Sequence, residues 1–147
     1  MNKERIIIYG SCYGTTKKYA EELSRRLDCK AVSYENVSDI SDKTVCIVTV
    51  GLADPKNEEN INNIRMKMKT QVSEELFNKA KIFHLRGGID YAELSFLHKK
   101  MMGMVYKKAK SVLEEERNAE LSAMIETYNK QADFVDFDSL DPIVQSL

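Results

Sequence analysis

Residues 5–27, which read RIIIYGSCYGTTKKYAEELSRRL, decide the fold. Residues 5–9 form a short run rich in β-branched side chains, which predicts a strand. After a polar segment, Ala20, Leu23 and Leu27 recur at helical spacing and predict a helix. The stretch is therefore typical of a strand, a tight loop and a helix.

The rest of the chain repeats this alternation of strand-like and helical segments. Further strand-like runs lie at 30–34, 44–50 and 81–85, and 44–50 is continuously apolar, as in parallel strands covered on both faces. A helical pattern lies at about 56–79, with Asp54 as its predicted N-cap and a restart predicted at Ser73, and another begins at Leu94. Parallel neighbours need crossovers, so we expect the α/β class, with about four core strands and helices on both faces.

The order of the strands can also be predicted. We expect 5–9 to be central, with 30–34 at one edge and 44–50 as the other neighbour, followed by 81–85. A gap beside the first strand would leave buried N–H and C=O groups without partners. Residues 35–43 leave about nine positions between two strands, fewer than a helical crossover usually takes, so a unit is compressed or absent there.

Composition bounds the class of protein. The 147 residues fit a single domain spanning 1–147, and 43% apolar residues are enough for a small core. With 22 basic and 23 acidic side chains no overall field favours nucleic acid, and the short apolar run at the start is neither a signal peptide nor a membrane span. Three widely spaced cysteines without a C-x-x-C pattern are interpreted as reduced thiols, and no metal site is expected. We expect a cytoplasmic protein.

The junction between the first strand and the first helix is a candidate anion site. Free N–H groups and the positive end of the helix dipole converge there, Ser and Thr hydroxyls add donors, and Gly14 permits close approach. The loop is neither a Walker loop, because no G-K-[ST] closes it, nor a G-x-G-x-x-G fingerprint. The alternative is that Ser11 and Thr15 or Thr16 merely cap the helix.

The segment IIIYGSCYGTTKKYAEEL resembles the opening of flavodoxins. It is more similar still to flavodoxin-domain proteins related to menaquinone-dependent protoporphyrinogen dehydrogenase, whose loop runs roughly Y-[AGS]-S-x-x-G-x-T. VTVGLADPKN, FHLRGGIDYAELSFLHKKMMG and DFVDFDSL also resemble members of that group. The resemblance implies a flavodoxin-like three-layer open parallel sheet, and flavin mononucleotide (FMN) held without a covalent bond.

The resemblance also implies which residues hold the flavin. The phosphate would lie among the residues of the first loop, where Cys12 replaces a residue that is often polar or basic. The run 44–50 would take the place of the family's fourth strand, with the loop after Gly51 beside the ring, and the third strand unit has no counterpart. A second glycine-containing turn follows 81–85, and Tyr91 there is placed to stack on a flavin, although a plain turn fits equally. The candidate cofactor-binding residues are Ser11, Cys12, Tyr13, Gly14, Thr15, Thr16, Gly51, Leu52, Ala53, Gly87, Gly88 and Tyr91.

Other features give weaker signals. His84 lies in a strand and His98 on a helix without triad or ligand spacing, so we interpret both as structural and expect no catalytic side chain. Methionines and lysines from Lys99 to Lys110 form an amphipathic helix. It fits either a core-packing helix with a solvated lysine face, or weak contact with a membrane surface or a protein partner.

Two functions from different classes remain. The first is an FMN-binding protein of electron transfer or flavin-dependent oxidoreduction, with a quinone or a redox protein as partner, and by resemblance with a tetrapyrrole precursor as substrate. The second is a flavin-free binding or interaction module that keeps the fold but has lost part of the flavin site. The shortened crossover favours the second, and the loop around Gly14 favours the first.

Overall fold

The computed structural model describes residues 5–10, 14–33, 35 and 45–147. Its strands are β1 (Ile6–Tyr9), β2 (Lys30–Ser33), β3 (Cys46–Gly51), β4 (Lys81–Arg86), β5 (Gly88–Asp90) and β6 (Gln131–Asp133). Its α-helices are α1 (Thr15–Leu27), α2 (Glu58–Lys69), α3 (Glu74–Lys79), α4 (Phe96–Ser111), α5 (Ala119–Thr127) and α6 (Asp141–Ser146), and its 3-10 helices are η2 (Glu114–Glu116) and η3 (Phe137–Leu140). The expected α/β class and the four strands are confirmed.

The four parallel strands form two separate pairs. Strand β1 pairs with β2, with Ile7 opposite Ala31, and β3 pairs with β4, with Val48 opposite Phe83. Within the described residues β1 and β3 form no ladder, so the prediction of one continuous four-stranded sheet is wrong for this part of the chain. Ile7 and Val48 nevertheless pack against the same core, so side-chain packing rather than backbone hydrogen bonding connects the two pairs.

One extended run changes partner at Gly87. Before this residue β4 pairs in parallel with β3, and after it β5 pairs antiparallel with β6 from the end of the chain. The Gly87 N–H donates to the Gly51 carbonyl at 2.7 Å, and the Gly87 carbonyl accepts from the Phe134 N–H at 3.0 Å. In the sequence, helices α4 and α5 lie between β5 and β6, and they form a helical hairpin. This antiparallel pair was not predicted from the sequence.

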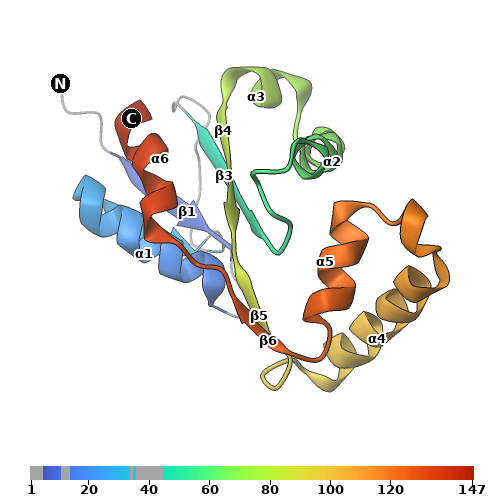
Figure 1. Cartoon of the computed structure of the whole chain (residues 1–147). Helices are drawn as coiled ribbons and strands as arrows, with labels where there is room; N and C mark the ends of the chain where they lie inside the picture. Colours follow the sequence, from blue (N-terminus) through green and yellow to red (C-terminus); the bar gives the residue numbers. More distant parts are fainter. Residues whose placement is uncertain (1–4, 11–13, 34, 36–44) are drawn as a thin grey trace.

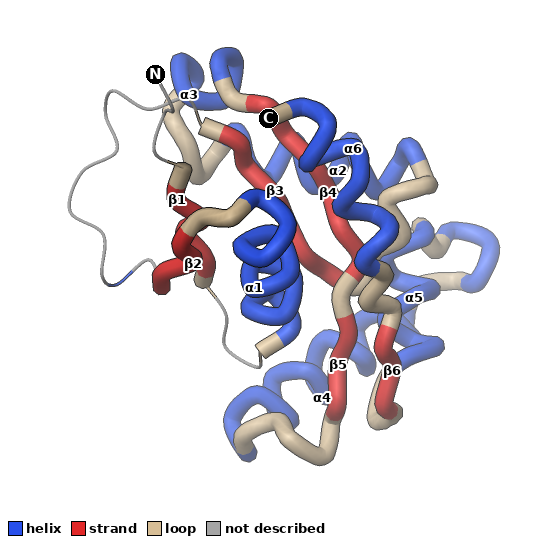
Figure 2. The backbone as a smooth tube through the Cα atoms, turned by 90° about the vertical axis from the view of Figure 1, so that its left-hand side faces the viewer, coloured by secondary structure: helices blue, strands red, loops and turns tan. Residues whose placement is uncertain are grey.

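Helices cover both sides of the β3–β4 pair. Helices α1 and α6 lie on one side, and α2 and α3 lie on the other (Figure 1 and Figure 2). The main core lies on the α1 and α6 side, where Leu140 and Ile143 are fully buried together with Tyr19, Leu23 and Leu85. The C-terminal segment therefore completes the core that the first helix begins.

Short polar side chains mark where α2 and α3 begin. Helix α2 begins after Asn57, whose side chain accepts from the Asn60 N–H, so the prediction of Asp54 as its N-cap is wrong. Asp54 instead accepts from the Lys56 N–H at 3.0 Å and forms a local turn before the helix. The predicted restart at Ser73 is confirmed, since Ser73 is the N-cap of α3.

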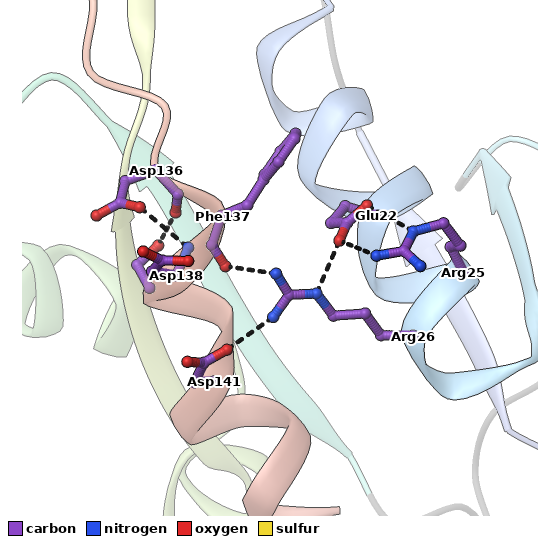
Figure 3. A network of polar contacts seen from close by, with 8 residues as sticks. Glu22, Arg25, Arg26, Asp136, Phe137, Asp138 and Asp141 are labelled. Carbon is purple, nitrogen blue, oxygen red and sulfur yellow. Dashed lines mark hydrogen bonds and ion pairs between the residues drawn. The ribbon is translucent and has the colours of Figure 1, made fainter.

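A polar network fixes α1 to the C-terminal segment (Figure 3). The Arg26 guanidinium donates to Glu22 at 2.8 Å in its own helix, to the Phe137 carbonyl at 3.1 Å and to Asp141 at 2.8 Å. Arg25 donates to the same Glu22 carboxylate at 2.7 and 3.0 Å. One planar guanidinium thus connects α1, η3 and α6 at the edge of the core.

Candidate functional site

Three segments that the sequence analysis selected meet at Gly87. A Cβ at Gly87 would lie 2.9 Å from Val50 Cγ1 and 3.1 Å from Thr15 Cγ2, closer than side chains normally approach. Glycine therefore allows the first residue of α1 to pack where β3 and β4 end. The carboxyl ends of parallel strands are where open α/β sheets bind ligands.

A cavity of about 450 Å³ opens beside this junction. Its volume lies within the range of small-molecule and cofactor sites. It is bounded by α1, the loop after β3, the β5–β6 pair and α4. The lining residues are Thr15, Lys18, Leu52, Gly88, Ile89, Asp90, Glu93, Leu94, His98, Met101, Met102, Gln131, Ala132 and Asp133.

One end of the cavity is positively polarised. Thr15 and Lys18 come from the first turn of α1, which follows Gly14 in the left-handed conformation with φ of 87°. The Gly14 carbonyl accepts from the Lys18 N–H at 3.0 Å, so the helical hydrogen bonding begins directly beside the cavity. A helix N-terminus, a hydroxyl and an ammonium group together suit an anionic group such as a phosphate.

A second part of the cavity lining is apolar. It is formed by Leu52 after β3, by Ile89 of β5, and by Leu94, Met101 and Met102 at the start of the α4–α5 hairpin. Methionine side chains are unbranched and polarisable, and they fit themselves against flat or irregular apolar groups. The cavity therefore suits a ligand with an anionic end and an apolar body.

Three carboxylates are also among the lining residues of the cavity. Asp90 accepts from the Ala92 N–H at 2.9 Å and Asp133 from the Val135 N–H at 3.0 Å, and Glu93 is exposed nearby. These groups accept hydrogen bonds from hydroxyl or N–H groups and repel an anion. An anionic ligand group is accordingly directed toward α1.

Arg86 holds the loop after β3 in place. Its Nε donates to the Leu52 carbonyl at 3.0 Å, and its guanidinium carbon lies 3.6 Å from the centroid of the Phe134 ring. Its own carbonyl accepts from the Tyr19 hydroxyl at 2.6 Å, and that hydroxyl accepts from the Asp136 N–H at 3.0 Å. Arg86 and Tyr19 thus connect α1, β4 and the C-terminal segment behind the cavity.

The structure brings some of the predicted site residues together and separates others. Thr15, Leu52 and Gly88 line the cavity, and Gly51 and Gly87 form its hydrogen-bonded corner. Gly14, Thr16 and Ala53 flank lining residues in the chain without lining the cavity themselves. Ser11, Cys12 and Tyr13 lie outside the described residues.

Tyr91 lies beside the cavity, buried and not among its described lining residues. Its ring meets the Tyr128 ring edge to face, with centroids 5.4 Å apart, and its hydroxyl has no hydrogen-bond partner among the described residues. Burial raises the pKa of the Tyr91 hydroxyl, and the neighbouring Tyr128 raises it further. The predicted stacking of Tyr91 on a flavin stays a prediction.

Several lining residues were not assigned to the site from the sequence. Lys18 follows the predicted loop by only two positions, so its distance along the chain could have indicated it. His98 is interpreted from the sequence as structural, and Met101 and Met102 as parts of an amphipathic helix, and the hairpin places all three on the cavity wall. Asp133 is brought to the cavity by the antiparallel pairing of β6 with β5, which was not predicted from the sequence.

The remaining titratable groups fit structural roles. His84 Nδ1 lies 2.6 Å from Thr49 Oγ1 on the neighbouring strand, and burial, assisted by the positive charge of Arg65, lowers the pKa of His84. Cys29 and Cys46 are free thiols whose pKa is raised by burial.

Among the described residues, no group of three or more His, Cys, Asp or Glu side chains is arranged to hold a metal ion. The described part of the chain also contains no helix with the length and apolar character needed to cross a membrane.

Comparison with known families gives one match. A family model described as a flavodoxin domain matches residues 35–114, which is more than half of the chain. The matched range includes β3, β4, β5 and α4, and therefore most of the cavity wall, but it begins after the first loop and α1. Neither the curated proteins nor the solved structures gave a match.

Proposed function

Because the chain belongs to the flavodoxin-domain family, we propose that it binds FMN without a covalent bond and serves in cytoplasmic electron transfer or flavin-dependent oxidoreduction. The observation that carries the proposal is the cavity shared by Thr15, Leu52 and Gly88, which come from three separate predicted segments. Its positively polarised end and its apolar wall correspond to the two ends of FMN, an anionic phosphate and a flat ring system.

The residues of the cavity suggest how FMN would be held. The phosphate would lie at the start of α1 near Thr15 and Lys18, together with the loop residues that the flavodoxin resemblance implies. The ring would pack on the apolar wall that includes Leu52 and Met102. The ribityl hydroxyls would donate to carboxylates such as Asp90 and Asp133.

The flavin, when bound, supplies the redox chemistry. The chain would bind the phosphate and orient the ring. The α4–α5 hairpin would cover one side of the ring and so limit the access of water to it. Arg86 would contribute by positioning the loop at Leu52, because its guanidinium group donates to that carbonyl. No side chain needs to act as an acid or a base in this proposal.

The resemblance of the first loop extends the proposal to a substrate. It favours an enzyme related to menaquinone-dependent protoporphyrinogen dehydrogenase, which would oxidise a tetrapyrrole precursor and pass the electrons to a quinone. A general electron carrier that reduces a redox protein would use the same cavity. Flavin-dependent oxidation of the tetrapyrrole by the purified protein with a quinone acceptor would support the enzyme, and reduction of a carrier protein alone would support the second form.

Two neighbouring lysines of α1 provide the test of the flavin site. Both are exposed, but Lys18 lines the cavity, whereas Lys17 does not and lies 3.7 Å from Glu21 on the same helix. We expect Lys18→Gln to weaken FMN binding roughly tenfold through loss of a charge-assisted phosphate contact, and Lys17→Gln to change it little. Flavin fluorescence titration measures both affinities.

Riboflavin, which lacks the phosphate, is the matched ligand control. We expect it to bind the wild-type protein more weakly than FMN and to bind both lysine variants equally. Equal affinity of FMN for the wild-type protein and the Lys18→Gln variant would place the phosphate elsewhere. Failure of both flavins to bind would remove the proposal.

The observation that favours the alternative function is the separation of β1–β2 from β3–β4 among the described residues. A flavodoxin-fold module that lost a central strand unit would keep the helices and the C-terminal segment while serving as a binding module. The colour of the purified protein distinguishes the two, since bound oxidised flavin makes a solution yellow. A colourless protein that does not take up added FMN would support the binding module.

A further inference from the structure

One side of α4 carries large apolar side chains that the described part of the chain does not cover. Leu97, Met101, Met104 and Val105 follow one another at intervals of four, three and one residues, which places them on the same side of the helix. We refer to these four residues as the α4 stripe. Leu97 is 71% exposed and Met104 67%, and the adjoining Phe96 at the start of the helix is 84% exposed.

The side of α4 next to the stripe is the packed side. Ala109 is fully buried, Tyr106 stacks on Tyr128 with ring centroids 3.9 Å apart, and His98 and Met102 line the cavity. The interpretation of α4 as a core-packing helix is therefore correct for this side only. The stripe is not the hydrophobic seam of the α4–α5 hairpin.

The charge of α4 is entirely positive. The helix contains Lys99, Lys100, Lys107, Lys108 and Lys110 and no acidic residue. The nearest acidic residues in the chain, Glu93 and Glu114, lie outside the helix on either side. Lysine side chains extend along an apolar surface while their ammonium groups stay in water or reach anionic groups.

We propose that α4 docks into the interface of an anionic lipid bilayer, with the α4 stripe among the acyl chains and the lysines at the headgroups. An interfacial helix has this combination of an apolar side and cationic flanks, and each lysine near an anionic surface adds to the attraction. Exposed apolar patches rimmed by charge mark interaction sites in general.

The observations favour lipid over a second copy of the chain. Two copies joined through this surface would bring two sets of five lysines together, which opposes association. An acidic protein partner would match the charge but would need a groove to receive side chains as exposed as Phe96 and Leu97. A fluid bilayer accepts protruding side chains without a preformed groove.

The position of α4 in the molecule fits this role. The helix lies at an outer end of the molecule, away from α6 (Figure 1 and Figure 2). Met101 belongs both to the stripe and to the lining of the cavity, so the proposed lipid-facing surface is continuous with the candidate site.

Vesicle co-sedimentation of the full chain tests the proposal. The vesicles consist of phosphatidylcholine alone or of phosphatidylcholine with phosphatidylglycerol. We expect binding to the anionic vesicles that decreases with added salt, and much weaker binding to the neutral ones. The double variant Leu97→Gln/Met104→Gln should partition about tenfold or more weakly into anionic vesicles, because two apolar side chains are lost from the interface.

Matched variants elsewhere on the surface control for general stickiness. Met66 on α2 is 64% exposed and Leu147 at the C-terminus 42% exposed, so Met66→Gln/Leu147→Gln removes the same residue types and should bind as the wild type does. Likewise Lys100→Gln/Lys107→Gln should weaken binding by about fivefold for each lysine, whereas Lys56→Gln/Lys69→Gln should leave it nearly unchanged. Circular dichroism and thermal unfolding establish that each variant is folded.

Three outcomes would overturn the proposal. They are equal binding to neutral and anionic vesicles, no binding to either, and equal loss of binding in the stripe variant and its control. Concentration-dependent dimerisation that the stripe variant abolishes, without vesicle binding, would assign the surface to a second copy instead. FMN titration in the absence of vesicles reports on the proposed function separately, so failure of one proposal is distinguishable from failure of the other.

Discussion

Helices α1 and α4 have similar patterns in the sequence and different surroundings in the structure. Both carry apolar residues at helical spacing and several lysines or arginines. In α1 the apolar side is buried, with Tyr19, Ala20 and Leu23 in the core. In α4 only Ala109 is buried, and the large apolar residues of the α4 stripe are exposed.

The difference follows from what surrounds each helix. Helix α1 packs against the strands on one side and is connected to η3 and α6 by Arg26, so a wide part of its surface is covered. Helix α4 packs mainly on α5, and some of its residues line the cavity. Only a narrow part of its surface is therefore covered. Apolar periodicity identifies a helix face, and its neighbours decide whether that face stabilises the fold or remains available for binding.

The same substitution on the two helices should separate these roles. Leu23→Ala in α1 removes a buried side chain from the main core, and we expect it to lower the free energy of unfolding by about 2 to 5 kcal/mol. Urea unfolding followed by circular dichroism measures the change. A loss below about 1 kcal/mol would mean that the core tolerates a cavity beside α1 and would remove the contrast with α4.

A second test applies to the junction that both helices border. Gly87→Ala would place a methyl group 2.9 Å from Val50 and 3.1 Å from Thr15, and we expect a loss of about 1 to 3 kcal/mol together with weaker flavin binding. Gly51→Ala is the control, because nothing lies within 4 Å of its added Cβ. Equal unfolding free energies for the two variants would show that the corner is loosely packed.

Local patterns were enough to predict the elements. The β-branched run of β1, the continuous apolar run of β3 and the Ser73 cap of α3 each depend on near neighbours in the chain. The predicted pairing of β1 with β3 is wrong for the described residues, because backbone pairing between strands is a long-range property that no local pattern specifies, even where the two strands share a core. Strand β6 has only three residues, and its extended conformation depends on pairing with β5. It is too short to show a periodicity that would predict it.

The site was predictable in part for the same reason. Thr15, Leu52 and Gly88 lie where strands end, and strand ends can be read from the sequence. The predicted contact of Tyr91 with a ligand stays a prediction, and in the structure Tyr128, just after α5, packs against its ring. The contributions of His98 and Met102 depend on how the α4–α5 hairpin folds back, which is a long-range property.

A pH titration tests the polar side of α1. The Arg25 and Arg26 guanidinium groups, through hydrogen bonds to Glu22, hold the pKa of that carboxyl at about 2, below its ordinary 4.5. The unfolded state therefore binds more protons than the folded state between these values. The stabilisation is complete above pH 4.5 and is lost as the pH falls toward about 2.

We expect Glu22→Gln to flatten the loss of stability in this acid range, measured as the urea midpoint at a series of pH values. Glu21→Gln is the control on the same helix, because Glu21 pairs with Lys17 at 3.7 Å and both side chains are exposed. A Glu22→Gln variant with the same acid dependence as the wild-type protein would contradict the assignment of this dependence to the Arg25 and Arg26 contacts.

The smallest expected effect is that of Leu97→Ala in α4. Leu97 is exposed, so its truncation leaves no cavity, and alanine is at least as favourable as leucine within a helix. We expect a change of about 0.5 kcal/mol or less in the free energy of unfolding, measured as for Leu23→Ala. A loss as large as that of Leu23→Ala would mean that the α4 stripe is covered within the protein in solution, and the contrast between the two helices, together with the docking role of α4, would no longer hold.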